Sequence, residues 1–288
     1  MLLPLAAIVC AQAPIALVRA PIPDAETVSI QVFFRVGSAY ESEADAGVTH
    51  LVEHLLFRGG EPGSLDRDIE RLGGRLEATT YRDLLRVWCT VPKEHALRAA
   101  EVMRESVAPI APQQPDIEAE RRMVLQELAL QRLDTQRAVL DLLWQSIARD
   151  SGYALPTGGA TEAIQILSPT TVAEWSQRAL GRERMALVVS GSASLEEADR
   201  IRALFDDLPA GDASSLEAPA WRESGGYSMA GVNEVLGVGF RAPSPTDARA
   251  YVAWMIAWEV LAGTDGAALR AGLLCRPRLD PTGAGTLA

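Results

Sequence analysis

Residues 47–57 read Gly-Val-Thr-His-Leu-Val-Glu-His-Leu-Leu-Phe, and this stretch predicts an amphipathic helix. With about 100° of rotation per residue, one face of that helix is apolar. The apolar face consists of Val48, Leu51, Val52, Leu55 and Leu56. The opposite face consists of His50, Glu53, His54 and Phe57. We therefore expect the helix to bury one side and to present two imidazoles and a carboxylate on the other.

The two histidines are spaced for binding a single metal ion. His50 and His54 lie four positions apart, which is one helical turn, and neutral imidazole is a good ligand for Zn²⁺. A carboxylate between them, Glu53, can take a proton from an attacking water. The order H-x-x-E-H is the inverzincin pattern. The alternative is a pair of surface histidines, but the chain has only 3 histidines, and His95 has no such partner.

A zinc site that stays open to water needs a third protein ligand. The segment Asp116–Leu133 predicts a long helix that offers Glu118, Glu120 and Glu127. Glu120 and Glu127 are two turns apart and share a face with Met123. Because the segment is apolar nearly all round, we expect it to be buried, and a buried carboxylate needs a partner such as a metal. Alternatively, one or both glutamates are surface charges.

The rest of the chain mixes strands and helices. The predicted strands are Ile15–Ala20, Val28–Val36, a hairpin of Arg75–Thr80 and Leu84–Val91, and the buried run Met185–Ser190. Further helices are predicted at Ser64–Leu72, Pro92–Val107, Thr135–Ala148, Pro169–Leu180 and Ser194–Leu204. Tyr81-Arg82-Asp83 is expected to be the turn of the hairpin.

Composition shifts suggest a domain plan. Residues 1–13 resemble a short secretory signal, residues 14–208 form the zinc-bearing domain, and residues 209–226 form a linker. Residues 227–288 hold a predicted strand, Val232–Arg241, and a helix, Thr246–Leu261. We expect them to be the beginning of a second domain that is cut short, because so few elements cannot bury a core.

Composition also excludes several classes of protein. The net charge of −11 argues against a nucleic-acid partner, whose binding surface would be basic. No run after the first residues reaches the roughly 18 apolar residues of a membrane span. The three cysteines, Cys10, Cys89 and Cys275, are too far apart in sequence for a C-x-x-C metal site.

The motif and the later glutamates together resemble the pitrilysin family of metallopeptidases, which includes insulin-degrading enzyme and the mitochondrial processing peptidases. In that family H-x-x-E-H is followed some seventy-odd residues later by a glutamate ligand, with a second glutamate seven residues before it. Here 72 residues separate His54 from Glu127. The resemblance implies one Zn²⁺ per chain, with His50, His54 and Glu127 as ligands. It implies that Glu53 is the general base and that Glu120 is the acid that orients the site.

A second part of the resemblance concerns substrate binding. Residues 73–80, Gly-Gly-Arg-Leu-Glu-Ala-Thr-Thr, resemble the family's edge strand, G-G-x-x-N-A-x-T, to which a substrate adds as an extra strand. This implies that Glu77, Ala78 and Thr79 bind substrate. Glu77 stands where the family usually has Asn, and Leu85 and Val87 replace the usual Thr and Tyr of the next strand.

From these features we expect an α+β fold, a two-layer sandwich of a mostly antiparallel sheet with helices on one face, followed by the start of a similar domain. The expected function is a zinc-dependent endopeptidase that acts on peptides or small unfolded proteins. One alternative is a non-catalytic or partner-dependent subunit of a heteromeric peptidase of this fold, and another is a zinc hydrolase of non-peptide substrates. The expected partners are a peptide and a second domain or chain of the same fold. A secreted or periplasmic location is favoured.

Overall fold

The computed structural model describes residues 15–58, 64–212, 243, 247–262, 280–282 and 285–287. The predicted signal in residues 1–13 and the predicted strand Val232–Arg241 lie outside these residues. Most of the predicted linker also lies outside them.

The described fold is built on a five-stranded sheet with the order β1-β5-β2-β4-β3. The strands are β1 (Ala16–Pro21), β2 (Thr27–Phe34), β3 (Arg75–Thr80), β4 (Leu85–Pro92) and β5 (Met185–Gly191). Only β1 and β5 pair in parallel, and the other three pairs are antiparallel. The mostly antiparallel sheet predicted from the sequence is thereby confirmed, and β3 lies at one of its edges.

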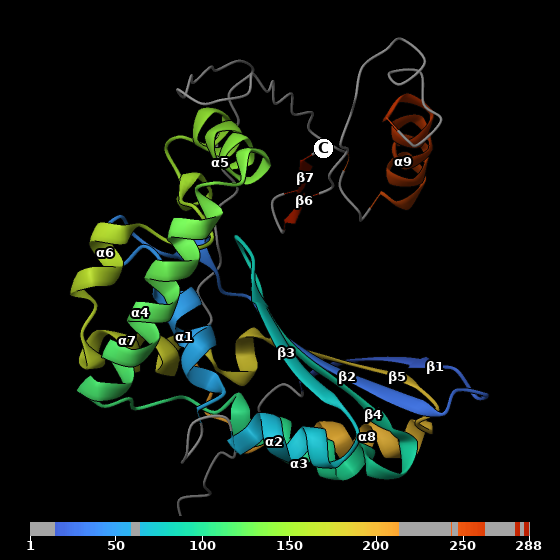
Figure 1. The fold of residues 1–288 in the computed structure, drawn as a ribbon. Coiled ribbons are helices and arrows are strands. Elements are labelled where there is room, and N and C mark those ends of the chain that lie inside the picture. Colours follow the sequence, from blue (N-terminus) through green and yellow to red (C-terminus); the bar gives the residue numbers. More distant parts are fainter. Residues whose placement is uncertain are drawn as a thin grey trace, which may run out of the picture.

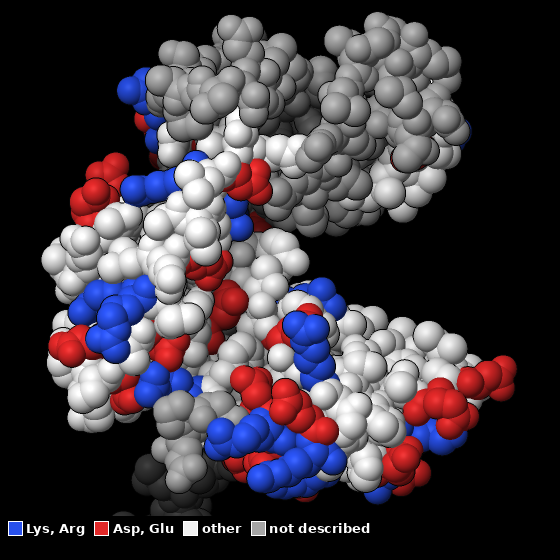
Figure 2. Space-filling view, viewed as in Figure 1, with Lys and Arg blue, Asp and Glu red and all other residues white. Residues whose placement is uncertain are grey.

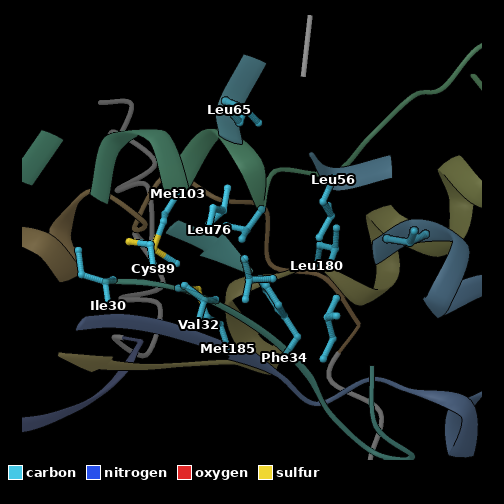
Figure 3. Close-up of a cluster of buried hydrophobic side chains, with 14 of the residues drawn as sticks. Ile30, Val32, Phe34, Leu56, Leu65, Leu76, Cys89, Met103, Leu180 and Met185 are labelled. Carbon is cyan, nitrogen blue, oxygen red and sulfur yellow. The ribbon is translucent and has the colours of Figure 1, made fainter. Parts of the chain in front are cut away.

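Period-two patterning explains which face of the sheet is covered. Val28, Ile30, Val32 and Phe34 of β2 are fully buried, whereas the residues between them are only partly buried. Figure 3 shows labelled side chains of this layer from β2, β4 and a helix: Ile30, Val32, Phe34, Cys89 and Met103. The covered face of the sheet therefore forms the main core.

Seven of the nine described α-helices form two groups around the sheet. The bounds of all nine are α1 (Val48–Leu56), α2 (Ser64–Arg71), α3 (Ala96–Ser106), α4 (Gln114–Gln131), α5 (Thr135–Ile147), α6 (Thr161–Ile166), α7 (Pro169–Ala179), α8 (Leu195–Ala203) and α9 (Ala248–Ala262). Helices α2, α3 and α8 lie along one face of the sheet, as predicted, while α1, α4, α6 and α7 gather beyond the ends of the strands (Figure 1). The short helix α6 was not predicted from the sequence.

Helix α1 is enclosed more completely than its sequence pattern suggests. It contacts α4, α7 and β3. The predicted apolar face is buried, but His50 on the opposite face is also buried, with 6% of its surface exposed. The alternative of surface histidines is therefore wrong for His50, because α4 packs against the same side of the helix.

Helix α4 is less buried than predicted. Ile117, Val124 and Leu128 are its buried residues, but Met123 is 55% exposed and Leu130 is 64% exposed. The prediction of a helix buried nearly all round is wrong, because only the side that faces α1 and α6 is covered. Glu120 and Glu127 lie at the border between the covered and the exposed sides, since both are partly buried.

The last described segments are α9 and a small hairpin of β6 (Asp280–Thr282) and β7 (Gly285–Leu287). Helix α9 agrees with the predicted helix Thr246–Leu261 to within two residues at its start and one at its end. Within the described residues, no helix combines the length and the apolar character needed to cross a membrane.

Candidate metal centre

The structure brings the predicted ligands together from two helices. His50 and His54 lie on α1, and Glu127 lies on α4, which packs against it. Oε2 of Glu127 is 3.6 Å from Nε2 of His50 and 3.4 Å from Nε2 of His54. One ligand atom from each of the three residues lies within 4.8 Å of the others. Figure 2 shows acidic side chains in the strip between α4 and the sheet.

These distances fit a small tetrahedral ion. Zinc bonds to nitrogen and oxygen at about 2.0–2.2 Å, so neighbouring ligand atoms of a tetrahedral site lie about 3.4 Å apart. The two distances to Glu127 have this length before any ion is placed. Two imidazoles and one carboxylate also form a donor set that leaves a fourth position for water. The residues present therefore fit zinc.

The backbone sets which nitrogen of His50 faces the site. Nδ1 of His50 lies 3.2 Å from the carbonyl oxygen of Gly158. A carbonyl only accepts hydrogen bonds, so Nδ1 donates, and in the neutral ring Nε2, on the side of Glu127, is the nitrogen that can bind a metal. A carbonyl or carboxylate behind a metal-binding histidine is the usual way in which its ring is oriented.

His50 on α1 and Glu127 on α4 shift each other's pKa values. The contact with His50 lowers the pKa of Glu127 to about 2, although partial burial acts in the opposite direction. Burial lowers the pKa of His50, but Glu127 and Glu53 outweigh it, so the pKa of His50 is raised. The carboxylates thus favour positive charge at the histidines, either as a proton or as a bound cation.

Glu120 contacts the ring nitrogen of His54 that does not face Glu127. Its Oε2 lies 3.4 Å from Nδ1 of His54, and its Oε1 accepts a hydrogen bond of 2.7 Å from Arg58. Arg58 also lies 3.3 Å from Asp116, at the start of α4. Glu120 is therefore placed to orient His54 rather than to replace Glu127. The third candidate, Glu118, is exposed and bonds to Gln114.

Glu53 does not join the cluster of ligand atoms but is held beside it. Oε2 of Glu53 accepts a hydrogen bond of 2.5 Å from the hydroxyl of Thr80, the last residue of β3. The edge strand and the helix are thus tied together at the carboxylate next to His54. One carboxylate oxygen of Glu53 is held by Thr80, and Thr80 does not contact the other.

The three residues predicted to bind substrate lie on the edge strand. Glu77, Ala78 and Thr79 pair with β4 on one side, opposite Trp88, Val87 and Arg86. All three are partly buried, and Oε1 of Glu77 bonds to Arg75 at 2.6 Å. Strand β3 contacts α1, so this edge runs next to the helix that carries the histidines.

Sequence reasoning did not identify Arg58, Thr80 and Gly158 as parts of the site. Each contacts a site residue from another element or loop. Arg58 carries a weak signal, because it follows the motif by four positions and is the next cation along the chain. Thr80 carries no signal beyond the match of residues 73–80 to the family's edge strand, and Gly158 lies in a segment for which no site was predicted.

Comparison with known proteins gives a family match over this region. The model of the family described as Insulinase (peptidase family M16) matches residues 17–161. The matched residues include α1, β3, β4 and α4, and therefore all of the predicted site residues.

Among curated proteins, the chain is similar to three relatives of different kinds. It is 27% identical over 168 residues to mitochondrial cytochrome b-c1 complex subunit 1 of Rattus norvegicus, covering 57% of this chain and 35% of that protein. It is 25% identical over 198 residues to the mitochondrial-processing peptidase subunit beta of Caenorhabditis elegans, covering 67% and 43%. It is 24% identical over 211 residues to an uncharacterized zinc protease of Rickettsia bellii, covering 72% and 51%.

Solved structures share the fold. A protease from Helicobacter pylori aligns with a TM-score of 0.63 and 19% identity, over 72% of this chain and 51% of that one. A domain from Pseudomonas fluorescens, described as an inactive peptidase domain, aligns with a TM-score of 0.65 and 18% identity, over 71% and 51%. The chain thus spans about half or less of the length of the proteins that it matches.

Proposed function

Because the chain belongs to the insulinase family of peptidases, we propose that it carries the catalytic site of a zinc-dependent endopeptidase, with Glu53 as the general base. The observation that supports the proposal most strongly is the meeting of His50, His54 and Glu127, whose ligand atoms lie within 4.8 Å of one another. A merely structural helix pair would have no reason to place three ligand atoms at the spacing of a tetrahedral site.

The chemistry follows from the placement of the side chains. A zinc ion held by His50, His54 and Glu127 would supply Lewis acidity, which makes water more acidic and polarises a peptide carbonyl. Glu53 takes the proton of the attacking water on the oxygen that Thr80 leaves available. Glu53 then returns that proton to the leaving amine. Glu120 orients His54 through Nδ1, and the Gly158 carbonyl does the same for His50.

The proposed substrate is an extended peptide that adds to β3. An edge strand offers unpaired backbone groups to a peptide, and the side chains beside it then select among sequences. Glu77, Ala78 and Thr79 would supply the backbone contacts next to α1.

A second candidate function is that of a non-catalytic or partner-dependent subunit. The similarity to cytochrome b-c1 complex subunit 1, at 27% identity, favours it. The presence of Glu53 beside the ligand cluster favours catalysis instead, because a scaffold has no need of a general base. Since one relative is named as a subunit of a processing peptidase, we also propose a second domain or chain of the same fold as a partner of this chain.

The test separates the base from the ligands. Glu53→Gln should keep zinc bound and abolish hydrolysis of a mixed peptide library, because the amide cannot accept the proton. The control is Glu43→Gln, which changes an exposed glutamate in the loop before α1. This variant should keep both its zinc and its hydrolytic activity. Hydrolysis at the original rate by Glu53→Gln would contradict the proposal. Loss of zinc from that variant would instead make Glu53 a ligand.

A further inference from the structure

We propose that Glu41 is a positioning residue that holds the first turn of α1 in place and thereby sets the position of His50 for metal binding. The inference rests on the proposed function only in naming zinc as the ion. Glu41 lies in the loop before the helix, seven residues before its first residue. It is buried, with 8% of its surface exposed. Its hydrogen bonds go to Gly47 and Thr49, not to a predicted ligand.

Both oxygens of Glu41 bind the beginning of α1. Oε2 accepts a hydrogen bond of 2.6 Å from the backbone N–H of Gly47, and Oε1 accepts one of 2.8 Å from that of Thr49. The first N–H groups of a helix have no partner within the helix, and an anion there also interacts favourably with the helix dipole. One carboxylate thus satisfies two of these donors.

The helix depends on this distant carboxylate because its own cap position is Gly47, which makes no side-chain cap. Gly47 has φ = 103°, and a Cβ there would lie 2.8 Å from Cδ1 of Ile164 and 2.9 Å from Cα of Gly159. Neither the backbone conformation nor the space allows the Ser, Thr, Asp or Asn that usually caps a helix. The cap must therefore come from elsewhere in the chain.

The position of His50 follows from that cap. His50 comes directly after Thr49, within the first turn, whereas Glu53 and His54 lie in the second turn. Without the carboxylate, the N–H groups of Gly47 and Thr49 would be left buried without these acceptors, and the turn would rearrange to reach others. His50 would move relative to Glu127, while His54 would stay fixed by Glu120.

The charge state of Glu41 decides the conditions of the test. Burial raises the pKa of Glu41 to about 7, although the N–H donors of Gly47 and Thr49 lower it. A protonated carboxyl group has only one good acceptor oxygen, so the double cap needs the ionised form. Measurements at pH 8 therefore examine the form that binds both N–H groups.

The experiment measures zinc affinity in the 288-residue chain by competition with a chelator at pH 8. Glu41→Ala removes both acceptors and should weaken zinc binding by about 10-fold to 100-fold. Glu41→Gln keeps one acceptor and should fall between Glu41→Ala and the wild type. The matched control is Ser194→Ala, which removes the side-chain cap of α8, a helix that packs against α3 and β1. Ser194→Ala should lower the free energy of unfolding by removing a helix cap, as Glu41→Ala does, but it should leave zinc affinity unchanged.

Two further measurements distinguish a change in ligand geometry from a general loss of stability. The visible absorption of bound Co²⁺ should change in Glu41→Ala and not in Ser194→Ala, since it reports ligand geometry rather than stability. Hydrogen exchange of the wild-type chain should show protected amides at Gly47 and Thr49. Wild-type zinc affinity and an unchanged Co²⁺ spectrum in the folded Glu41 variants, or unprotected amides in the wild type, would overturn the inference. A wild-type chain without zinc would instead refute the proposed function.

Discussion

Thr80 and Glu53 show how single residues from distant parts of the chain meet at the site. Thr80 ends β3 and Glu53 lies on α1, 27 positions earlier, yet the hydroxyl donates a hydrogen bond of 2.5 Å to the carboxylate. A bond from a neutral hydroxyl to a charged oxygen fixes the side chain of the base without neutralising it. If Glu53 is the general base, as proposed, it would therefore meet the attacking water in one orientation.

We expect Thr80→Val to lower kcat of peptide hydrolysis by about 10-fold, the effect of losing one hydrogen bond to a catalytic group. Zinc content should not change, because Thr80 touches no predicted ligand among its described contacts. Thr80→Ser should restore most of the rate. The control is Thr90→Val, an exposed position on β4. Equal rates in Thr80→Val and the wild type would show that Thr80 does not orient the base.

Contacts of this kind explain which site residues could be predicted from the sequence. His50, Glu53 and His54 follow from helical periodicity, and Glu120 and Glu127 share a face for the same local reason. Glu41, Thr80 and Gly158 act through contacts that depend on how separate segments pack, so no local pattern marks them. The absence of a capping side chain at Gly47 is the one local sign that an acceptor must come from elsewhere.

At the level of elements, the hairpin of β3 and β4 is anchored at its turn. Arg82 and Asp83 are buried, with 3% and 7% of their surfaces exposed. Arg82 bonds to Asp141 of α5 at 2.9 Å and to the carbonyl of Tyr153 at 3.1 Å, and its guanidinium lies 4.7 Å from the ring centre of Trp144. The turn thus joins the hairpin to a second, smaller core, which consists of Ala39, Trp144, Ala148 and Tyr153.

Replacing Arg82 should therefore destabilise the domain strongly. We expect Arg82→Met to lower the free energy of unfolding by about 3 kcal/mol, because it removes one partner of a buried ion pair. Arg75→Met is the control, since Arg75 pairs with Glu77 with 83% of its side chain exposed, and it should change the value by less than about 1 kcal/mol. Urea unfolding of both variants checks this, and equal midpoints would contradict the anchoring role.

The same elements show where sequence patterns were sufficient. Alternation in β2 and the apolar run in β5 predicted these two strands, and β3 and β4 were predicted as a hairpin around their turn. The turn at Arg82 was predicted correctly, but its burial was not, since polar turn residues usually face water. Helix α4 was predicted to be buried because its composition is apolar, yet composition does not show which sides other elements cover.

On the scale of the whole molecule, residues 209–212 are hydrogen-bonded to the domain that carries the candidate metal centre. The N–H groups of Arg182 and Glu183 donate to the carbonyls of Pro209 and Ala210 at 3.0 and 3.1 Å. The N–H of Asp212 donates to the carbonyl of Arg178 at 2.9 Å, and Arg184 reaches the carbonyl of Asp212 at 2.5 Å. We therefore propose that the domain extends to residue 212.

A chain that ends at residue 212 should consequently be more stable than one that ends at residue 208. The four hydrogen bonds lost in the shorter chain are partly exposed, so we expect a difference of about 1–3 kcal/mol in the free energy of unfolding. Both chains should bind zinc equally, since the site lies on α1 and α4. Thermal and urea unfolding with EDTA present measure the difference. Identical stability would place residues 209–212 outside the domain.

Metal content per chain decides whether α1 and α4 together form a zinc site. The wild-type protein should carry one zinc per chain, and Glu118→Gln, an exposed change on the same helix, should do so too. Glu127→Gln should lose most of its zinc, because the amide is a much weaker ligand than the carboxylate. Equal zinc content in Glu127→Gln and Glu118→Gln, or no zinc in the wild type, would contradict a zinc site formed by α1 and α4.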